Sequence, residues 1–303
     1  MGYAIAVANM KGGVGKTTTT VSLADTFAAQ DKKVLVVDLD AQANASVSVI
    51  GIAGYAEVLK RGHTIEHYFQ TNVDASLRRE SPIPASTYFS EGLAHVTHQG
   101  EKLDITLLAA SPEMRYLERD IIIDLNNRQL GLRAVETKLA QILKRDLVLM
   151  RRDFDYVLFD CAPGISPFSE AAIRLVDLVI SPTIPDFISV QGLPQFCNYL
   201  AGQRKRQHSG RRRSMPHVLA TRVRSNTQQH REYLRKMDEA AAVDDRVYGM
   251  FKTHIPDSIK VSQAIQVVDD SFPTYQQRWS AMLDQLDALT NEIEEVLDGD
   301  HAV

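Results

Sequence analysis

The chain has few cysteines, with only Cys161 and Cys197 among its 303 residues. These two form no CxxC pair and have no histidine at ligand spacing. The sequence therefore argues against disulfides and metal clusters, and we expect both thiols to be buried. No apolar run approaches the roughly 20 residues that span a bilayer. No basic and apolar signal segment precedes the first expected strand, which favours a cytosolic protein.

A strong net charge is also missing, because 34 Lys and Arg oppose 38 Asp and Glu. The apolar content of 44% is typical of a globular protein, and the length suits one α/β domain with insertions. The local charge is uneven. Residues 200–236 hold eleven Lys or Arg and one acid, whereas residues 284–303 hold seven acids and no Lys or Arg. This asymmetry favours a local face that binds a polyanion.

Short β-branched runs alternate with helical patterns along the chain. The runs predict buried strands at 3–8, 33–38, 103–109, 156–160, 178–180 and 217–220. The helical patterns lie at about 17–29, 113–123, 131–151, 168–175, 189–206 and 226–243. This alternation predicts an α/β fold, a doubly wound and mostly parallel sheet with helices on both faces. In such sheets ligands bind at the carboxyl ends of the strands.

We expect one domain over residues 1–281, followed by an amphipathic helix and acidic tail over 282–303. Residues 45–102 are less regular and are interpreted as an elaborated connection, with short helices near 55–60 and 64–70. The last helix has an apolar stripe between Met282 and Leu297, which either packs on the domain or docks a partner. Four histidines without ligand partners are interpreted as surface residues: His63, His67, His95 and His98.

The run Lys-Gly-Gly-Val-Gly-Lys-Thr-Thr occupies residues 11–18, between the first strand and the first helix. Strand, glycine loop and helix form the context of a phosphate-binding loop. Glycines let backbone N–H groups converge on a polyphosphate, and the helix N-terminus adds a favourable dipole. Lys16 is placed to reach the β- and γ-phosphates, and Thr17 to ligate Mg²⁺. The expected nucleotide contacts are Gly12, Gly13, Val14, Gly15, Lys16, Thr17 and Thr18.

Acidic side chains follow two other expected strands. Asp38 and Asp40 lie two residues apart, so that one can approach the Mg²⁺ shell while the other orients the attacking water. Asp160 ends an apolar strand, which is the Walker B arrangement for holding Mg²⁺ through water. Because these acids, the glycine loop and Arg222 all fall at strand ends, we expect them to converge on one site.

The ordinary phosphate-binding loop has glycine where this chain has Met10, and Lys11 follows it. The resulting pattern, K-G-G-x-G-K-S/T, resembles the deviant Walker A motif of the ParA/MinD family. The resemblance implies that Lys11 reaches across a dimer interface to the partner's nucleotide. It further implies that ATP favours the dimer, that hydrolysis releases it, and that turnover is slow until a partner stimulates it.

Further segments resemble the same family over about residues 1–50 and 150–270. Residues 38–44 are similar to its D-x-D-P-Q-x-N motif with Ala41 in the proline position, and residues 160–164 to its D-x-P-P-S/G motif with Ala162 in the first proline position. By this resemblance Asp38 and Asp160 support the metal and Asp40 positions the water. Relatives cradle adenine at the positions that match Arg222, Pro256 and Asp257.

Within that family the basic run favours ParA-type partition ATPases, which bind DNA without sequence preference as ATP-bound dimers. An acidic chain end does not fit the basic membrane helix of MinD-like relatives, and the cysteines fit neither the nitrogenase iron protein nor iron–sulfur carriers. No helix-turn-helix precedes the loop, so we expect no operator recognition. The expected DNA contacts are Arg204, Lys205, Arg206, Arg211, Arg212 and Arg213, with Lys252 and Lys260 in second rank.

The sequence thus predicts a cytoplasmic, nucleoid-associated ATP hydrolase that uses Mg²⁺ and segregates or positions plasmid or chromosomal DNA. Its expected partners are a second copy of the chain, DNA, and a ParB-like or cargo-adaptor protein that stimulates hydrolysis. Two alternatives remain. One is an ATPase that positions a protein cargo such as a carboxysome or chemoreceptor cluster. The other is a small-molecule amidoligase on the same scaffold.

Overall fold

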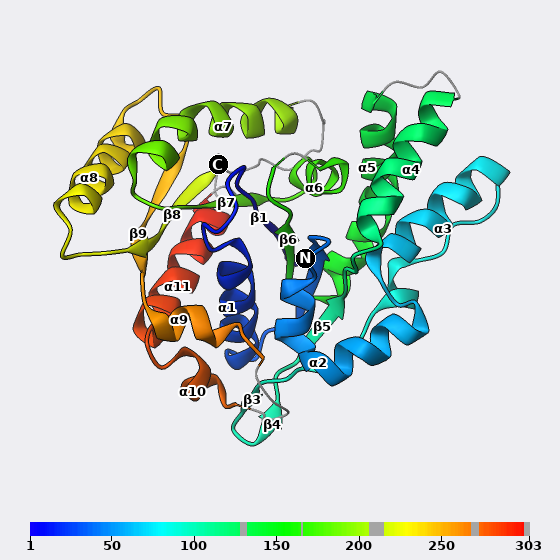
Figure 1. Ribbon diagram of the computed structural model, residues 1–303, viewed down its shortest axis with the longest axis horizontal. Coiled ribbons are helices and arrows are strands. Elements are labelled where there is room, and N and C mark those ends of the chain that lie inside the picture. Colours follow the sequence, from blue (N-terminus) through cyan, green and yellow to red (C-terminus); the bar gives the residue numbers. More distant parts are fainter. Residues whose placement is uncertain (128–131, 165, 206–214, 268–272, 300–303) are drawn as a thin grey trace.

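The computed structural model describes residues 1–127, 132–164, 166–205, 215–267 and 273–299 (Figure 1). Its centre is a seven-stranded sheet of order β5-β2-β6-β1-β7-β8-β9, in which all recorded neighbours are parallel. This confirms the expected α/β fold. The strands are β1 (Tyr3–Val7), β2 (Val34–Leu39), β5 (Ile105–Leu108), β6 (Tyr156–Cys161), β7 (Leu178–Thr183), β8 (His217–Val223) and β9 (Gly249–Pro256), with a small separate hairpin of β3 (Thr97–His98) and β4 (Glu101–Lys102).

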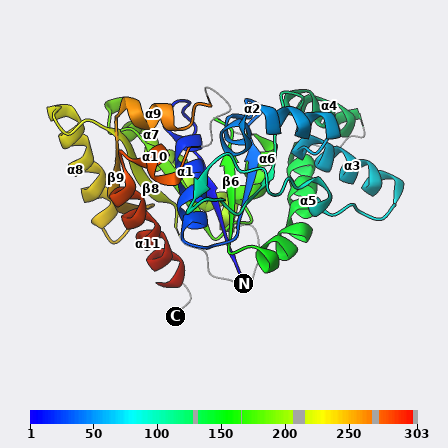
Figure 2. The ribbon, with the colours of Figure 1, turned by 90° about the horizontal axis from the view of Figure 1, so that it is seen from below.

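Helices cover both faces of the sheet. One face carries α1 (Lys16–Ala29), α2 (Asn44–Arg61), α9 (Ile259–Ala264), α10 (Tyr275–Trp279) and α11 (Leu283–Gly299). The other carries α3 (Ile65–Arg78), α4 (Met114–Asn127), α5 (Leu132–Asp153), α6 (Pro167–Ile173) and α7 (Phe187–Lys205), with α8 (Gln228–Ala242) packed beside α7. Figure 2 shows α3, α4 and α5 at the end of the sheet opposite α8. Among the described residues no helix is long and apolar enough to cross a bilayer.

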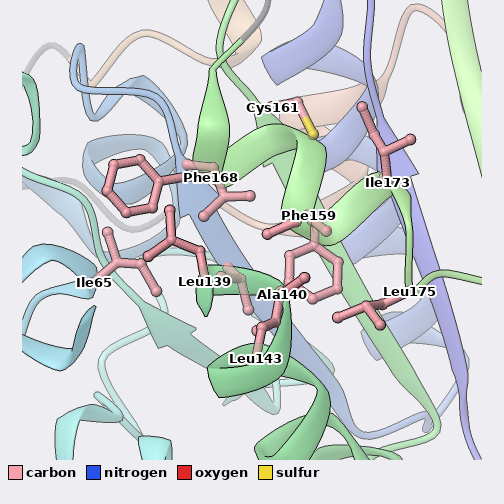
Figure 3. Packing of buried hydrophobic residues seen from close by; sticks show 14 of the residues in the cluster. Ile65, Leu139, Ala140, Leu143, Phe159, Cys161, Phe168, Ile173 and Leu175 are labelled. Atoms are coloured by element: carbon pink, nitrogen blue, oxygen red, sulfur yellow. The ribbon is translucent and has the colours of Figure 1, made fainter. Parts of the chain in front are cut away.

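Side chains alternate between the two cores along each central strand, as the pleat requires. In β1, Ala4 and Ala6 face one core whereas Ile5 and Val7 face the other. Figure 3 shows the first of these cores, where Phe159 of β6 lies against helical side chains such as Leu143. Because the strands are buried on both faces, they read in the sequence as continuous apolar runs. Cys161 is buried in the first core and Cys197 in a smaller cluster between β8, α7 and α8, as expected, and burial raises the pKa of each thiol to about 12.

Residues 45–102 are more helical than the sequence predicted. Instead of two short helices, α2 has 18 residues and α3 has 14. A kink at Gly51, with φ +73°, interrupts the pattern of α2. His95 explains this glycine, because a Cβ there would lie 2.9 Å from His95 Nδ1. The interpretation of all four histidines as surface residues is wrong for His95, which is 8% exposed and donates its backbone N–H to the Val49 carbonyl.

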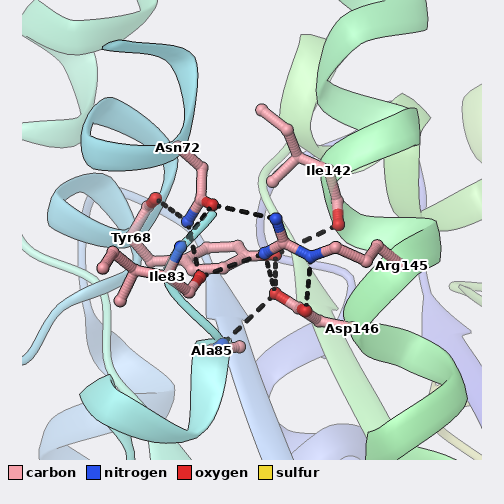
Figure 4. A network of polar contacts seen from close by, with 7 residues as sticks. All are labelled: Tyr68, Asn72, Ile83, Ala85, Ile142, Arg145 and Asp146. Atoms are coloured by element: carbon pink, nitrogen blue, oxygen red, sulfur yellow. Dashed lines mark hydrogen bonds and ion pairs between the residues drawn. The ribbon is translucent and has the colours of Figure 1, made fainter. Parts of the chain in front are cut away.

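A polar network fixes α3 against α5 (Figure 4). Buried Asp146 accepts hydrogen bonds from the Tyr68 hydroxyl at 2.7 Å and from the Ala85 backbone N–H at 3.2 Å. Arg145 pairs with the same carboxylate at 2.6 Å and also donates to Asn72 Oδ1. The network also includes a short 3₁₀ helix, η1 (Ala85–Tyr88). Because every member is satisfied, the network holds α3 in one position on the sheet.

The C-terminal part contains elements that the sequence did not reveal, namely β9, α9 and α10. Of the two roles that the sequence left open for the apolar stripe of the last helix, the structure shows packing on the domain. Leu286, Leu289 and Ile293 are fully buried in the core that also contains α1, and α11 lies against α1 and β9.

Candidate functional site

A cavity of about 450 Å³ lies at the carboxyl ends of the strands, between the glycine loop, β8 and the β9–α9 segment. Most of the expected nucleotide contacts line it, including Lys16, Asp40 and Arg222. Val14, Asp38 and Asp160 are buried and do not line the cavity, and Lys11 is also outside the lining. The expected residues in the lining are Gly12, Gly13, Gly15, Lys16, Thr17, Thr18, Asp40, Arg222, Pro256 and Asp257.

Hydrogen bonds from β8 fix the shape of the glycine loop. Gly13 and Gly15 have φ values of +73° and +92°, which side chains rarely tolerate. A Cβ built on Gly13 meets no protein atom within 4 Å, so the space in front of the loop is free for a ligand. From the cavity wall, the Thr221 hydroxyl donates to the Val14 carbonyl at 2.7 Å, and Arg222 Nη1 donates to the Gly13 carbonyl at 3.3 Å. This loop shape fits a polyphosphate.

Lys16 begins α1 and is 7% exposed. Its ammonium donates to the Lys11 carbonyl at 3.0 Å. Burial lowers the pKa of Lys16, although the carboxylates of Asp160 and Asp40 oppose this effect. A buried cation that donates to a backbone carbonyl is suited to an incoming anion, because the anion would replace the lost hydration.

Asp38 and Asp160 lie side by side as register partners on β2 and β6. Asp38 accepts hydrogen bonds from the Ser46 hydroxyl at 2.7 Å and the Ser46 N–H at 2.9 Å. Asp160 accepts from the hydroxyls of Thr17 at 2.8 Å and Thr20 at 3.0 Å. Burial raises the pKa of both carboxyl groups, and Asp38 raises that of Asp160 further.

These oxygen donors fit Mg²⁺, which prefers a few protein oxygens together with water and phosphate oxygens. No three His, Cys, Asp or Glu side chains in the described part of the chain form a complete metal-binding group, so phosphate would have to complete the shell. Thr17 connects the cavity with the buried acids, because it lines the cavity and also donates a hydrogen bond to Asp160. When bound, Mg²⁺ would neutralise phosphate charge and relieve the repulsion between the two buried acids.

Asp40 lies in the cavity wall and is only partly buried. Its Oδ1 accepts the backbone N–H of Gln42 at 2.9 Å, and its own N–H donates to Asp38 Oδ1 at 3.0 Å. The two acids of this segment are therefore divided, with Asp38 beneath the cavity and Asp40 in its wall. The different tasks that the sequence predicts for these two acids stay predictions.

Lys11 is directed away from the cavity. Its ammonium contacts the Ser189 hydroxyl at 2.9 Å and Asp186 Oδ2 at 3.3 Å, both at the start of α7. Asn9 sets this direction, because its Oδ1 accepts the Lys11 N–H and its Nδ2 donates to the Pro182 carbonyl. Three exposed apolar side chains flank these residues, namely Met10, Phe187 and Ile188, at 46%, 54% and 72% exposure.

Arg222 and Asp257 contact each other at 3.2 Å, and Arg224 holds the same carboxylate at 2.6 Å. The hydrogen bond from Arg224 lowers the pKa of Asp257 below its ordinary value, and Arg222 adds to this. Arg222 has a positive φ of 52°. The carboxylate therefore orients Arg222 at the cavity. The sequence did not reveal Asn9, Ser46, Thr221 or Arg224. For Asn9, Thr221 and Arg224 the reason is that their partners lie 33 or more residues away in the chain.

The expected DNA contacts are only partly within the described residues. Arg206, Arg211, Arg212 and Arg213 lie outside them, and Arg204 and Lys205 end α7. Lys252 on β9 and Lys260 on α9 are exposed. Figure 1 shows α7 along the top of the molecule and α9 well below it, so the two helices lie in different parts of the molecule.

Comparisons with known proteins identify the family of the chain. A family model described as an AAA domain matches residues 2–210. The sporulation initiation inhibitor protein Soj of Bacillus subtilis is 28% identical over 264 residues, which are 87% of this chain and 88% of that protein. Chromosome partitioning protein ParA of Myxococcus xanthus is 26% identical over 195 residues, 64% of this chain and 56% of that protein. An uncharacterized protein of Pseudomonas putida is 31% identical over 193 residues, 64% of this chain, and the chain spans 60% of its length.

Solved structures share the fold at low identity. McdA of Cyanothece in its apo form has a TM-score of 0.64 and 17% identity, with 97% of this chain and 100% of that chain covered. A putative plasmid partition protein of Borrelia burgdorferi bound to AMPPNP has a TM-score of 0.62 and 19% identity. The match covers 96% of this chain and 100% of that chain. Cobyrinic acid a,c-diamide synthase of Mycobacterium smegmatis, with bound ATP analog and magnesium, has a TM-score of 0.63 and 19% identity. The match covers 97% of this chain and 96% of that chain. Since the family model covers most of the chain and partition proteins are among the relatives, the chain belongs to the ParA/MinD type of P-loop ATPase.

Proposed function

We propose that this protein is a cytoplasmic ATPase that dimerises on binding ATP, binds DNA without sequence preference, and partitions or positions DNA. Hydrolysis would release the dimer, and a ParB-like or adaptor protein would stimulate it. The observation that carries the proposal is the position of Lys11, a second lysine of the phosphate-binding loop that points out of its own cavity. A cation in this position can serve a nucleotide bound by another copy of the chain.

The residues divide the work of phosphoryl transfer, which consists mainly of positioning and charge neutralisation. Lys16 would contact the β- and γ-phosphates, and Thr17 with Asp38 and Asp160 would hold Mg²⁺. Asp40, in the cavity wall, would orient the attacking water. The backbone N–H groups of residues 12–18 would bind the phosphates. Arg222, Pro256 and Asp257 would line the base, which the cavity supports because all three border it.

The surface around Lys11 supports self-association. Met10, Phe187 and Ile188 are exposed beside it, and solvent-exposed apolar side chains that cluster around a charged group favour an interface. To reach a second copy, Lys11 must leave Asp186 and Ser189. Its contact with Asp186 is partly exposed to solvent, so this exchange costs little.

Replacing Lys11 by alanine is expected to weaken the ATP-dependent dimer by at least about tenfold in its dissociation constant. Nucleotide binding to the monomer should change little, because Lys11 does not line its own cavity. Sedimentation with a non-hydrolysable ATP analogue and Mg²⁺ measures the dimer, and fluorescent nucleotide measures binding. Lys60→Ala, which removes an exposed lysine from α2, is the matched control. An unchanged Lys11→Ala dimer would contradict the role of this lysine.

DNA binding is tested with a random-sequence duplex in the presence of ATP, of ADP and of no nucleotide, across a salt series. We expect binding only with ATP and independent of sequence. If about four phosphates are contacted, log affinity should fall with log salt at a slope near −3.6. Combined replacement of Arg211, Arg212 and Arg213 by glutamate should abolish it, whereas the Lys60→Ala control should not. Absence of binding with every nucleotide would overturn the DNA part of the proposal.

The same assays distinguish the two alternative functions from the proposed one. A positioning ATPase for a protein cargo would keep DNA-stimulated hydrolysis and differ only in what co-purifies with it. A small-molecule ligase would hydrolyse ATP in response to its own substrate and not to DNA. The solved cobyrinic acid a,c-diamide synthase shows that this fold also occurs in a synthase, so stimulation by DNA is the measurement that distinguishes them.

A further inference from the structure

A second cavity, of about 300 Å³, lies between α3 and α4 and shares no lining residue with the nucleotide cavity. Its walls carry the acids Glu66, Glu113 and Asp120, and no Lys or Arg is among the lining residues. The rest of the lining is His67, Gln70, Tyr116 and Leu117. The cavity therefore presents negative charge without an internal cation. Figure 1 shows α3 and α4 beside each other at the far end of the sheet from α8.

Glu66 distinguishes this cavity from an ordinary acidic surface. The residue is 4% exposed, and its Oε2 is buried without a hydrogen-bond partner. Its other oxygen, Oε1, accepts a hydrogen bond from the Ser111 hydroxyl. His67 does not satisfy Oε2, since its Nδ1 contacts the Thr64 hydroxyl and lies 3.9 Å from Oε1. A buried carboxylate oxygen without a donor is unfavourable, and a cationic donor that enters the cavity would satisfy it.

The shape and chemistry of the walls select the kind of cation. No set of three metal-ligating side chains converges here or elsewhere in the described residues, so a metal ion would lack ligands. A guanidinium group is planar and offers several donors that match a carboxylate, and it also stacks on aromatic rings. Tyr116, which is 64% exposed, supplies such a ring beside the acids. We propose that this cavity binds the guanidinium group of an arginine presented by a partner protein.

The cavity is connected to the nucleotide site through a few direct contacts. Ser111, which donates to Glu66, follows Ala110, whose N–H donates to the Ser46 hydroxyl at 3.0 Å. The same Ser46 hydroxyl donates to Asp38 at 2.7 Å. An arginine that binds Glu66 would therefore shift Ser111 and Ala110, and with them the Ser46 hydroxyl that positions Asp38. This regulatory consequence rests on the proposed function, whereas the binding of arginine does not.

The site is tested on the 303-residue chain by titrating it with a capped Gly-Arg-Gly peptide and recording backbone amide NMR shifts. We expect saturable shifts at Glu66, His67 and Ser111, weaker binding of capped Gly-Lys-Gly, and no binding of the neutral citrulline analogue. Glu66→Gln should raise the dissociation constant at least about tenfold, because it replaces a charged acceptor by a neutral one. Glu113→Gln, at an exposed position, should also weaken binding without risk to the fold.

Glu239→Gln is the matched control, since it removes the same charge from α8 at an exposed position and should leave binding unchanged. Equal binding of the citrulline peptide, or equal binding by the Glu66→Gln and Glu113→Gln variants, would overturn the site. If free arginine binds as tightly as the capped peptide, the claim that the arginine belongs to a partner protein would be overturned. The site would then accept the charged α-amino and α-carboxyl groups, which an arginine within a polypeptide lacks.

Coupling is tested by measuring peptide affinity with and without a non-hydrolysable ATP analogue and Mg²⁺. Reciprocity requires that each ligand change the affinity of the other by the same factor. Ser111→Ala should reduce that factor towards one while the peptide still binds. Equal peptide affinities with and without bound nucleotide would overturn the coupling. A protein that binds the peptide but not the analogue would contradict the proposed function and leave the arginine site standing.

Discussion

Replacing Lys16 by alanine is expected to lower ATP turnover by about 10²–10³-fold, which is the usual effect of removing one charge-stabilising group from an active site. Lys16 begins α1 at the phosphate-binding loop, and its ammonium donates a hydrogen bond to the Lys11 carbonyl. Steady-state phosphate release measures turnover. Titration of a fluorescent ATP analogue should show weaker binding of the triphosphate.

The same substitution should leave the nucleotide-free fold as stable as before, or more stable. Because burial lowers the pKa of Lys16, the unfolded chain binds this proton more readily than the folded chain. The charged ammonium therefore opposes folding below the ordinary lysine pKa, and this penalty fades as the pH rises through that range. Thermal unfolding of Lys16→Ala and of the control Lys33→Ala, at an exposed position, tests this. A large drop in stability for Lys16→Ala would contradict the view that Lys16 serves the ligand.

Replacing Arg278 by alanine is expected to lower the free energy of unfolding by about 3–5 kcal/mol, because it leaves a buried carboxylate unpaired. The Arg278 and Asp25 side chains are 3% and 1% exposed and lie 3.0 Å apart. Arg278 also donates to the Ser48 carbonyl and to the Ala264 carbonyl, and Trp279 donates to Asp25. One guanidinium thus joins α10 to α1, α2 and α9. Chemical denaturation measures the loss.

Arg235→Ala is the matched control, because Arg235 forms an ion pair of 2.7 Å with Glu239 on the surface of α8. Its removal should hardly change the free energy of unfolding, since exposed pairs contribute little. The pH dependence gives a second test. Burial already raises the pKa of Asp25, and Arg278 opposes that rise. Without Arg278 the pKa of folded Asp25 should rise further above its ordinary value, so the variant should lose more stability than the parent protein as the pH rises above the ordinary carboxyl range. A pH-independent loss would show that the carboxylate is not the cause.

Local chemistry carried most of the functional information. The glycine loop could be recognised because its strand, loop and helix are contiguous, so residues 3–29 contain the whole geometry. The acids could be recognised for a similar reason. Buried parallel strands read as apolar runs, and Asp38 and Asp160 interrupt two of them at the ends that must meet. The alternation of strands and helices then determined the order of layers, because few other arrangements bury such runs.

The tertiary structure decided what depends on contacts between distant segments. No local pattern marks β9, whose register with β8 is irregular, or the pairing of Asp25 with Arg278 across 253 residues. The buried position of His95 follows from its contact with Gly51, and the acidity of the second cavity follows from the approach of α3 to α4. The direction of Lys11 likewise depends on Ser189, which is 178 residues away. The sequence determines such contacts only through the complete packing of the chain, so the role of each residue becomes readable once the fold brings its partners together.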